Sequence, residues 1–199
     1  MSLEKRQKND VGDQAGHGPP PCAFAVIEAR KTMKKVLVIG SGGAGKSIFA
    51  RHLGKLLNID VIHLDALYWH PGWVQTPRTE WRQVIEELLR RDAWIIDGNY
   101  SNTLDLRLAA CDTVIFLDIA RPICLWRVLK RAILYRRRTR PDMAAGCRER
   151  LDWEFLRWVW RYKRQTKPQI IELLRQSAQS KQVIWLRTPA EVKRFLASG

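Results

Sequence analysis

The sequence has few of the features that mark membrane proteins, disulfide-rich secreted proteins or zinc proteins. No apolar run approaches the roughly 20 residues that a membrane-spanning helix needs, and residues 1–21 lack the apolar core of a secretory signal. The four cysteines include no C-x-x-C pair, and the four histidines lack the spacing of metal ligands. These absences favour a cytoplasmic protein with reduced thiols, no structural metal and no membrane partner.

Acidic residues are scarce in one part of the chain. The whole sequence of 199 residues carries a net charge of +15, and residues 121–167 hold fifteen Lys and Arg against four Asp and Glu. Such a block is typical of a solvated face, of a lid that grips phosphate groups, or of a surface that binds nucleic acid. Composition alone leaves these three alternatives open.

The first 32 residues contain little periodic apolar sequence. They are polar and include Gly-His-Gly-Pro-Pro-Pro at 16–21, so we expect a disordered leader over 1–32. Met33 stands just before the first apolar run and is a candidate for the natural start of the protein. We therefore place one domain at 33–199, a length that is sufficient for an α/β core.

From residue 35 onward, apolar strand-like runs alternate with amphipathic helical segments. We expect strands at 35–39, 59–63, 93–96, 113–117 and 182–186. Helices are expected at 47–57, 77–91, 122–136 and 151–164, with another starting at Pro168 and a last one opened by the capping box Thr188–Glu191. This alternation predicts an α/β fold with a five-stranded parallel sheet flanked by helices.

The clearest functional motif follows the first strand and matches G-x-x-x-x-G-K-[ST]. Glycines in such a loop let backbone N–H groups surround a polyphosphate, and the helix that follows points its positive end at the same anion. The lysine reaches the β- and γ-phosphates, and the hydroxyl holds Mg²⁺. The pattern predicts a P-loop NTPase fold with ATP or GTP bound by Gly40, Ser41, Gly42, Gly43, Ala44, Gly45, Lys46 and Ser47.

Two carboxylates come at the ends of predicted strands, where open α/β sheets bind ligands. Asp97 ends Trp-Ile-Ile-Asp, and we expect it to support Mg²⁺ together with Ser47; the alternative is a turn aspartate before glycine. Asp65 ends the second strand and is expected to orient an acceptor hydroxyl or accept its proton; the alternative is a helix cap or turn residue. His63 is interpreted as a packed strand residue.

Arginines are spaced along two predicted helices that flank a basic loop. Arg127 and Arg131 share one helix face, and Arg157 and Arg161 belong to a stripe on the next long helix. Because guanidinium forks match phosphate oxygens, we expect an arginine-rich lid over about 122–165 whose arginines stabilise the transition state. The alternative for each arginine is a solvated basic surface.

Two further features leave alternatives open. Tyr68, Trp69 and Trp73 either form a pocket wall or cover the edge of the sheet. Arg107 either contacts an acceptor phosphate or pairs with a nearby aspartate.

Residues 34–197 resemble the adenylate-kinase-like branch of small P-loop kinases. The likeness rests on the phosphate loop, on His63–Trp69, on Ile95–Tyr100 and on the arginine-rich segment, and it is greatest for the bacterial group named DNA topology modulation proteins. It implies that Asp97 assists Mg²⁺. It also implies that Arg127 and Arg131 are the arginine pair at the start of the lid, and that Arg157 and Arg161 are the arginines that follow the lid.

The sequence departs from that family at one step. Nucleoside monophosphate kinases usually follow the aspartate-glycine pair with an aromatic residue, a proline and an arginine that binds the acceptor phosphate. This chain has Asn99, Tyr100 and Ser101 there.

These motifs predict an ATP-dependent kinase that transfers the γ-phosphoryl group of Mg·ATP to a small acceptor, with nucleosides and nucleotides among the candidates. Lys46, Asp65 and the four lid arginines are the expected catalytic residues, and we expect a monomer. The alternative is a nucleic-acid-associated ATP-binding protein or ATPase that affects DNA topology. Its support is the basic segment with interleaved tryptophans.

Overall fold

Five parallel strands lie at the centre of the molecule in the order β2-β5-β1-β6-β7. The protein is described here by a computed structural model, which covers residues 30, 32–136, 138–177 and 181–197. The strand bounds are β1 Lys35–Gly40, β2 Val61–His63, β5 Trp94–Asp97, β6 Thr113–Leu117 and β7 Gln182–Leu186. The predicted α/β fold, with a five-stranded parallel sheet flanked by helices, is confirmed.

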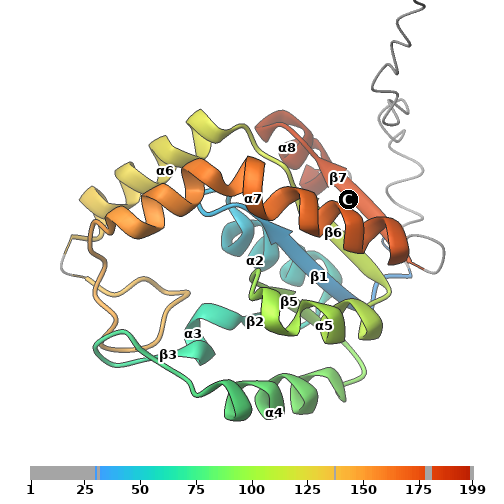
Figure 1. Cartoon of the computed structure of the whole chain (residues 1–199). Helices are drawn as coiled ribbons and strands as arrows, with labels where there is room; N and C mark the ends of the chain where they lie inside the picture. The colour runs from blue at the N-terminus through green and yellow to red at the C-terminus, as the bar shows by residue number, and fades with distance from the viewer. Residues whose placement is uncertain (1–29, 31, 137, 178–180, 198–199) are drawn as a thin grey trace, which may run out of the picture.

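Helices cover both faces of this sheet (Figure 1). Residues 36–39 of β1 are fully buried, as expected for a central parallel strand that is covered on both sides. The longer helices are α2 Lys46–Leu57, α4 Arg78–Leu89, α5 Leu104–Ala110, α6 Arg121–Leu134, α7 Trp153–Ser177 and α8 Pro189–Ala197. The short elements are α3 Leu64–Tyr68, the antiparallel pair β3 Trp69–His70 and β4 Val74–Gln75, and the 3₁₀ turn η1 Ser101–Thr103.

The long helix α7 crosses the carboxyl edge of the sheet. Its first half contributes Leu156 and Val159 to the core shared with α2 and α8. Its second half contributes Ile170 and Leu174 to the core shared with α4 and α5. On the way it passes the phosphate loop, since Phe155 and Val159 lie against Gly42.

Residues 151–177 were predicted as two helices separated at Pro168, and this is wrong. A single helix runs from Trp153 to Ser177 with Pro168 inside it. The start is capped by the Asp152 carboxylate, which accepts hydrogen bonds from the N–H groups of Glu154 (2.8 Å) and Phe155 (3.1 Å). An internal proline costs about 3 kcal/mol. Burial of apolar side chains on both sides of it offsets that cost.

Strand register decides which side chains meet at the edge of the sheet. Asp97 pairs with Val38 of β1 on one side and with His63 of β2 on the other. Asp65 follows two residues after His63, and the phosphate loop follows β1 directly. Parallel pairing therefore brings these residues together.

Most of the predicted leader, residues 1–29 and 31, lies outside the described residues, and the domain boundaries stay a prediction. The guanidinium of Arg30 lies over the ring of Phe195, 4.9 Å from its centroid. None of the helices in the described part of the chain is long and apolar enough to cross a membrane.

Candidate active site

The phosphate loop joins β1 to α2 and needs glycine for its shape. Gly43 and Gly45 have φ values of 77° and 97°, which residues with a side chain rarely adopt. A Cβ atom on Gly43 would lie 2.2 Å from the carbonyl oxygen of Cys124, at the point where α6 packs on the loop. The loop is thus shaped by left-handed backbone and by close contact with α6, and it leads into the N-terminus of α2.

The two polar side chains at the end of the loop have different neighbours. Lys46 Nζ donates to the carbonyl oxygen of Ser41 (3.2 Å). Ser47 lies near the carboxylate of Asp142, which comes from the loop between α6 and α7 and is only 8% exposed. The lid therefore brings a buried carboxylate close to the phosphate loop.

Asn99 ties the end of β5 to the start of the phosphate loop. Its side-chain amide donates to the carbonyl oxygen of Gly40 (2.8 Å) and accepts from the N–H of Gly40 (3.1 Å). In the sequence, Asn99 belongs to the Ile95–Tyr100 segment and departs from the kinase pattern, but no contact was predicted for it. The contact spans 59 positions, so no local signal predicted it.

Asp97 is buried and has one uncommitted oxygen. Its Oδ2 lies 3.0 Å from Nδ1 of His63, whereas Oδ1 has no hydrogen-bond partner among the described residues. The strand register places the two side chains next to each other, so His63 has a polar contact as well as a packing role. A buried oxygen without a partner is uncommon in a folded protein.

These oxygens suit magnesium. Mg²⁺ prefers hard oxygen ligands, takes few of them from the protein and keeps several waters. Ser47 and Asp97 supply a hydroxyl oxygen and the free Oδ1, although the described residues contain no cluster of three or more acidic, His or Cys ligands. The residues present therefore fit a sparsely ligated Mg²⁺ beside a polyphosphate.

Asp65 is held by a tyrosine. The hydroxyl of Tyr100 donates to Asp65 Oδ1 at 2.7 Å. Burial raises the pKa of Asp65 above its usual range, and the hydrogen bond from Tyr100 opposes that rise. A carboxylate with a raised pKa is a better proton acceptor near neutral pH.

Arg107 holds the backbone beside this pair. It is fully buried and donates to the carbonyl oxygens of Gly98 (2.8 Å), Asn99 (2.5 Å) and Tyr100 (2.6 Å). Neither of the roles considered from sequence fits, since all these bonds go to backbone. They hold Tyr100 at φ 27°, a strained conformation for a residue with a side chain.

The aromatic residues after β2 divide between packing and lid contact. The ring of Tyr68 lies 5.0 Å from that of Trp81 and 4.6 Å from that of Tyr100. The ring of Trp73 makes an edge-to-face contact with that of Trp69, and its Nε1 donates to the carbonyl oxygen of Arg148 at 3.0 Å. Tyr68 therefore joins the core, and Trp73 contacts the lid.

Two of the predicted lid arginines, both on α6, lie close to the site. Arg127 donates to the carbonyl oxygen of Ala44 in the phosphate loop (3.0 Å). Arg131 Nε lies 3.1 Å from Oε1 of Glu149. Arg127 therefore contacts the phosphate loop, whereas Arg131 is paired within the lid. The catalytic role of both arginines stays a prediction.

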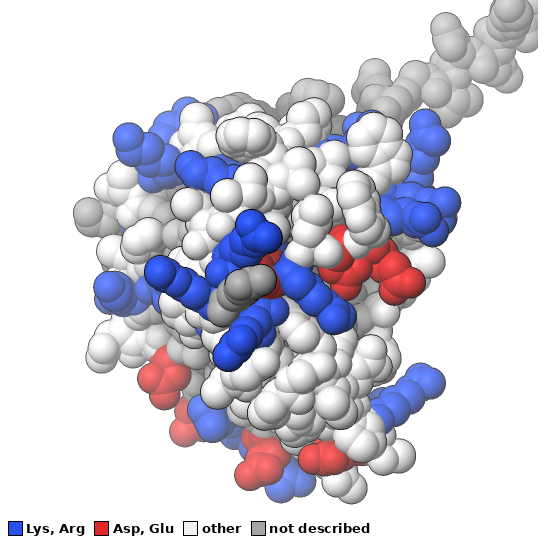
Figure 2. Space-filling model, turned by 90° about the vertical axis from the view of Figure 1, so that its left-hand side faces the viewer, with Lys and Arg blue, Asp and Glu red and all other residues white. Residues whose placement is uncertain are grey.

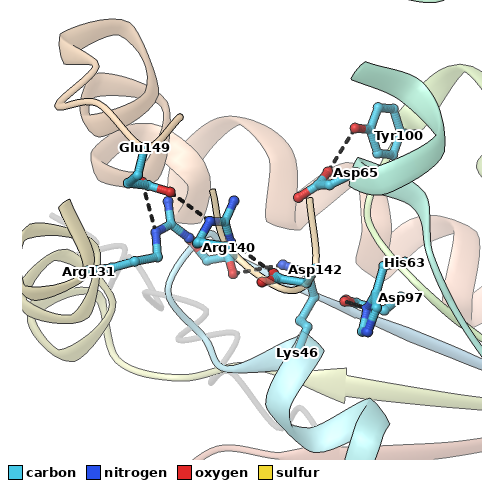
Figure 3. A network of polar contacts seen from close by, with 10 residues as sticks. Lys46, His63, Asp65, Asp97, Tyr100, Arg131, Arg140, Asp142 and Glu149 are labelled. Atoms are coloured by element: carbon cyan, nitrogen blue, oxygen red, sulfur yellow. Dashed lines mark hydrogen bonds and ion pairs between the residues drawn. The ribbon is translucent and has the colours of Figure 1, made fainter. Parts of the chain in front are cut away.

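A buried ionic network in the lid, built from Arg131, Arg140, Asp142 and Glu149, was not predicted. Arg140 Nε lies 2.6 Å from Glu149 Oε2, and its Nη1 lies 2.9 Å from Asp142 Oδ2. Figure 3 shows the four side chains between α6 and Asp65. Burial raises the pKa of Asp142, but Arg140 and the nearby Ser47 hydroxyl outweigh it and lower the pKa overall.

The loop that carries this network also contacts the β3–β4 hairpin on the opposite side of the site. Cys147 Sγ donates to the carbonyl oxygen of His70 (3.2 Å), and Gly146 lies against Pro71. The outer surface of the loop between α6 and α7 is basic. Figure 2 views the molecule from the side of this loop and shows Lys and Arg gathered in the middle of the view. Exposed arginines of the loop are Arg136, Arg138, Arg148 and Arg150.

The structure does not bring Arg157 and Arg161 to the phosphate loop. Both are exposed on α7. Residues two positions apart on a helix point in nearly opposite directions, and it is Phe155 and Val159 that face Gly42. The catalytic role of these two arginines stays a prediction.

The chain is similar to three small kinases of known structure, whereas no family model and no curated protein matches it. A gluconokinase from Sinorhizobium meliloti 1021 is 14% identical, with 83% of this chain and 90% of that chain covered and a TM-score of 0.49. A shikimate kinase from Acinetobacter baumannii in complex with shikimate is 19% identical, with 84% and 92% covered and a TM-score of 0.49. A deoxyadenosine kinase from M. mycoides is 14% identical, with 81% and 93% covered and a TM-score of 0.45.

Likeness at this level leaves the function to be argued from the residues of this chain. The resemblance to DNA topology modulation proteins and to the adenylate-kinase-like branch stays a prediction.

Proposed function

We propose that the protein is an ATP-dependent phosphotransferase that acts on the hydroxyl group of a small acceptor. The observation that carries the proposal is the grouping of a lysine-bearing phosphate loop with two carboxylates from neighbouring strand ends, one with a free oxygen and one with a raised pKa. Nucleosides, nucleotides and small hydroxylated metabolites are the candidate acceptors.

The donor side of the site is the phosphate loop. Backbone N–H groups of Gly40–Ser47 and the N-terminus of α2 bind the polyphosphate, and Lys46 neutralises charge on the β- and γ-phosphates. Ser47 and Asp97 are the residues that would hold Mg²⁺. When bound, the ion supplies further charge neutralisation on the same phosphate oxygens.

Transfer proceeds by displacement at the γ-phosphorus. The acceptor oxygen forms a bond to phosphorus while the bond to the β–γ bridging oxygen breaks, and ADP leaves. Asp65 orients the acceptor hydroxyl and takes its proton. Arg127 and Arg131 stabilise charge on the transferring group as the lid closes and excludes water.

The test is ADP release from Mg·ATP in the presence of nucleosides, nucleoside monophosphates, small hydroxylated metabolites and 5′-hydroxyl DNA. Acceptor-dependent release that is lost in Lys46→Ala supports the proposal and identifies the acceptor class. Release that no acceptor stimulates, or that DNA stimulates without becoming phosphorylated, would refute it in favour of a nucleic-acid-linked ATPase.

A further inference from the structure

A cavity lies beside α7 and borders the phosphate loop at Ser41. Its volume is about 350 Å³, within the usual range for small-molecule sites. It is bounded by α7 and by the segments that follow β6 and β7, and Ser41 is the one lining residue from the phosphate loop. The side chains that matter most for its chemistry are Asp118, Arg121, Tyr162, Lys163, Lys167 and Arg187.

Tyr162 leaves an unused hydrogen-bonding group in this cavity. The residue is only 5% exposed, and its hydroxyl has no hydrogen-bond partner among the described residues. The ring is fixed by an edge-on contact with Trp158, with 5.4 Å between centroids. Buried tyrosine hydroxyls ordinarily find a partner. Burial and the nearby charge of Asp118 raise the pKa of Tyr162, so the hydroxyl stays a donor at neutral pH.

The cavity carries an excess of positive charge. Lys167 Nζ lies 2.5 Å from Asp118 Oδ2, and this pair is neutral overall. Among the described residues no carboxylate pairs with Arg121, Lys163 or Arg187. Three cations therefore surround the cavity without acidic partners.

Aromatic side chains hold two of these cations in place. The guanidinium of Arg121 lies 4.2 Å from the ring centroid of Trp160 and donates to its carbonyl oxygen. The guanidinium of Arg187 lies 5.7 Å from the ring of Trp185. Stacked guanidinium groups remain free to donate in their own plane, which suits the oxygens of a phosphate group.

We propose that this cavity, which borders the phosphate loop at Ser41, binds a small phosphomonoester at a site other than that of the ATP polyphosphate. Arg121, Lys163 and Arg187 bind the phosphate group, and the Tyr162 hydroxyl donates to the ligand. The cavity exceeds the size of inorganic phosphate alone, which leaves room for a sugar-sized group beside it. Binding here involves no covalent step and does not depend on phosphoryl transfer.

The test uses two probes, inorganic phosphate and ribose 5-phosphate, with ribose as an uncharged control. Each is titrated by calorimetry into protein saturated with Mg²⁺ and a non-hydrolysable ATP analogue, so that the phosphate loop is filled. The same titrations in nucleotide-free Lys46→Ala give a second background that does not depend on nucleotide binding. Wild type should bind both phosphates, ribose 5-phosphate more tightly, and should not bind ribose.

Three variants locate the binding. Tyr162→Phe removes only the hydroxyl, and Lys163→Ala removes one cation; each should weaken ribose 5-phosphate binding by about tenfold, as expected for loss of one bond to a charged group. Arg164→Ala is the matched control, because Arg164 is an exposed neighbour of Lys163 that does not line the cavity, and its loss also removes one positive charge. This variant should bind ribose 5-phosphate with the affinity of wild type. An unchanged melting temperature in each variant checks the fold.

Three outcomes would overturn the proposal. The first is that neither inorganic phosphate nor ribose 5-phosphate binds. The second is that binding persists unchanged in both Tyr162→Phe and Lys163→Ala. The third is that these variants weaken binding in nucleotide-free protein but the nucleotide analogue abolishes that binding. The last result would make the cavity part of the donor-nucleotide site. A failure of the proposed phosphotransfer would leave all these binding measurements interpretable.

Discussion

The phosphate loop and the lid loop meet at Ser47 but are built in different ways. The phosphate loop is a contiguous stretch shaped by its own glycines and by the helix that follows it. The lid loop is held by charged side chains of α6 and of the loop itself. One region is thus shaped by its backbone and the other by ion pairs between side chains, so substitutions should affect them differently.

The largest effect is expected from the phosphate loop. Lys46→Ala should lower phosphoryl transfer by about 10³-fold, because it removes a charge aimed at the transferring group. Lys55→Ala, in the same helix but exposed, should have normal activity. Steady-state kinetics with equal melting temperatures would check this, and near-normal transfer in Lys46→Ala would contradict the role of the loop.

Asp65→Asn should lower kcat by about 10²-fold, since an amide cannot accept the acceptor proton. The KM for ATP should change little, because Asp65 lies on the acceptor side. An unchanged kcat with a higher KM for the acceptor would make Asp65 a binding group only.

The next effect breaks the lid. Glu149→Gln leaves Arg131 and Arg140 without their shared carboxylate, and removing one partner of a buried ion pair costs about 3 kcal/mol. We expect a lower melting temperature and faster proteolysis within residues 136–150. Glu154→Gln, an exposed carboxylate at the start of α7, is the control. Equal proteolysis rates for the two variants would show that the network does not hold the lid.

Tyr100→Phe should move the pH profile and change maximal activity only modestly. The hydrogen bond from Tyr100 lowers the pKa of Asp65, so its loss raises that pKa. Because the reaction needs ionised Asp65, the acid-side fall in activity should move to higher pH than in wild type. Tyr135→Phe should leave the profile of kcat/KM in place, and a shift in the opposite direction would contradict the coupling.

The smallest effects are expected at Arg157 and Arg161. Each changed to Ala should alter kcat less than twofold, roughly the scatter expected for exposed side chains. Arg131→Ala, by contrast, should lower it strongly. If Arg161→Ala matches Arg131→Ala, then α7 must turn its exposed face toward the phosphates during the reaction.

Local patterns made the fold and half of the site predictable. The alternation of strands and helices predicted the parallel sheet, and the N-cap role of Thr188 is confirmed, since its hydroxyl accepts from the N–H of Glu191. The Glu191 carboxylate accepts from the N–H of Arg187 rather than from that of Thr188. The phosphate loop could be predicted because its residues are consecutive in the sequence. The proximity of Asp65 and Asp97 could be predicted because parallel strands end at the same edge of the sheet.

Contacts between distant residues could not be predicted in the same way. Asn99 bonds Gly40 across 59 positions, and nothing in a basic loop marks Glu149 as the carboxylate that two arginines share. Arg107 was predicted either to contact an acceptor phosphate or to pair with an aspartate, yet its buried guanidinium donates to backbone carbonyl oxygens. Pro168 was given too much weight as a helix breaker, because packing on both sides keeps α7 continuous.

The most direct test of phosphotransfer is to follow the γ-phosphorus of Mg·ATP by ³¹P NMR, with the acceptor that stimulates ADP release. The account predicts a phosphomonoester signal on the acceptor that grows with ADP in wild type and is absent in Lys46→Ala. A signal of inorganic phosphate alone, growing at the same rate with or without acceptor, would contradict it.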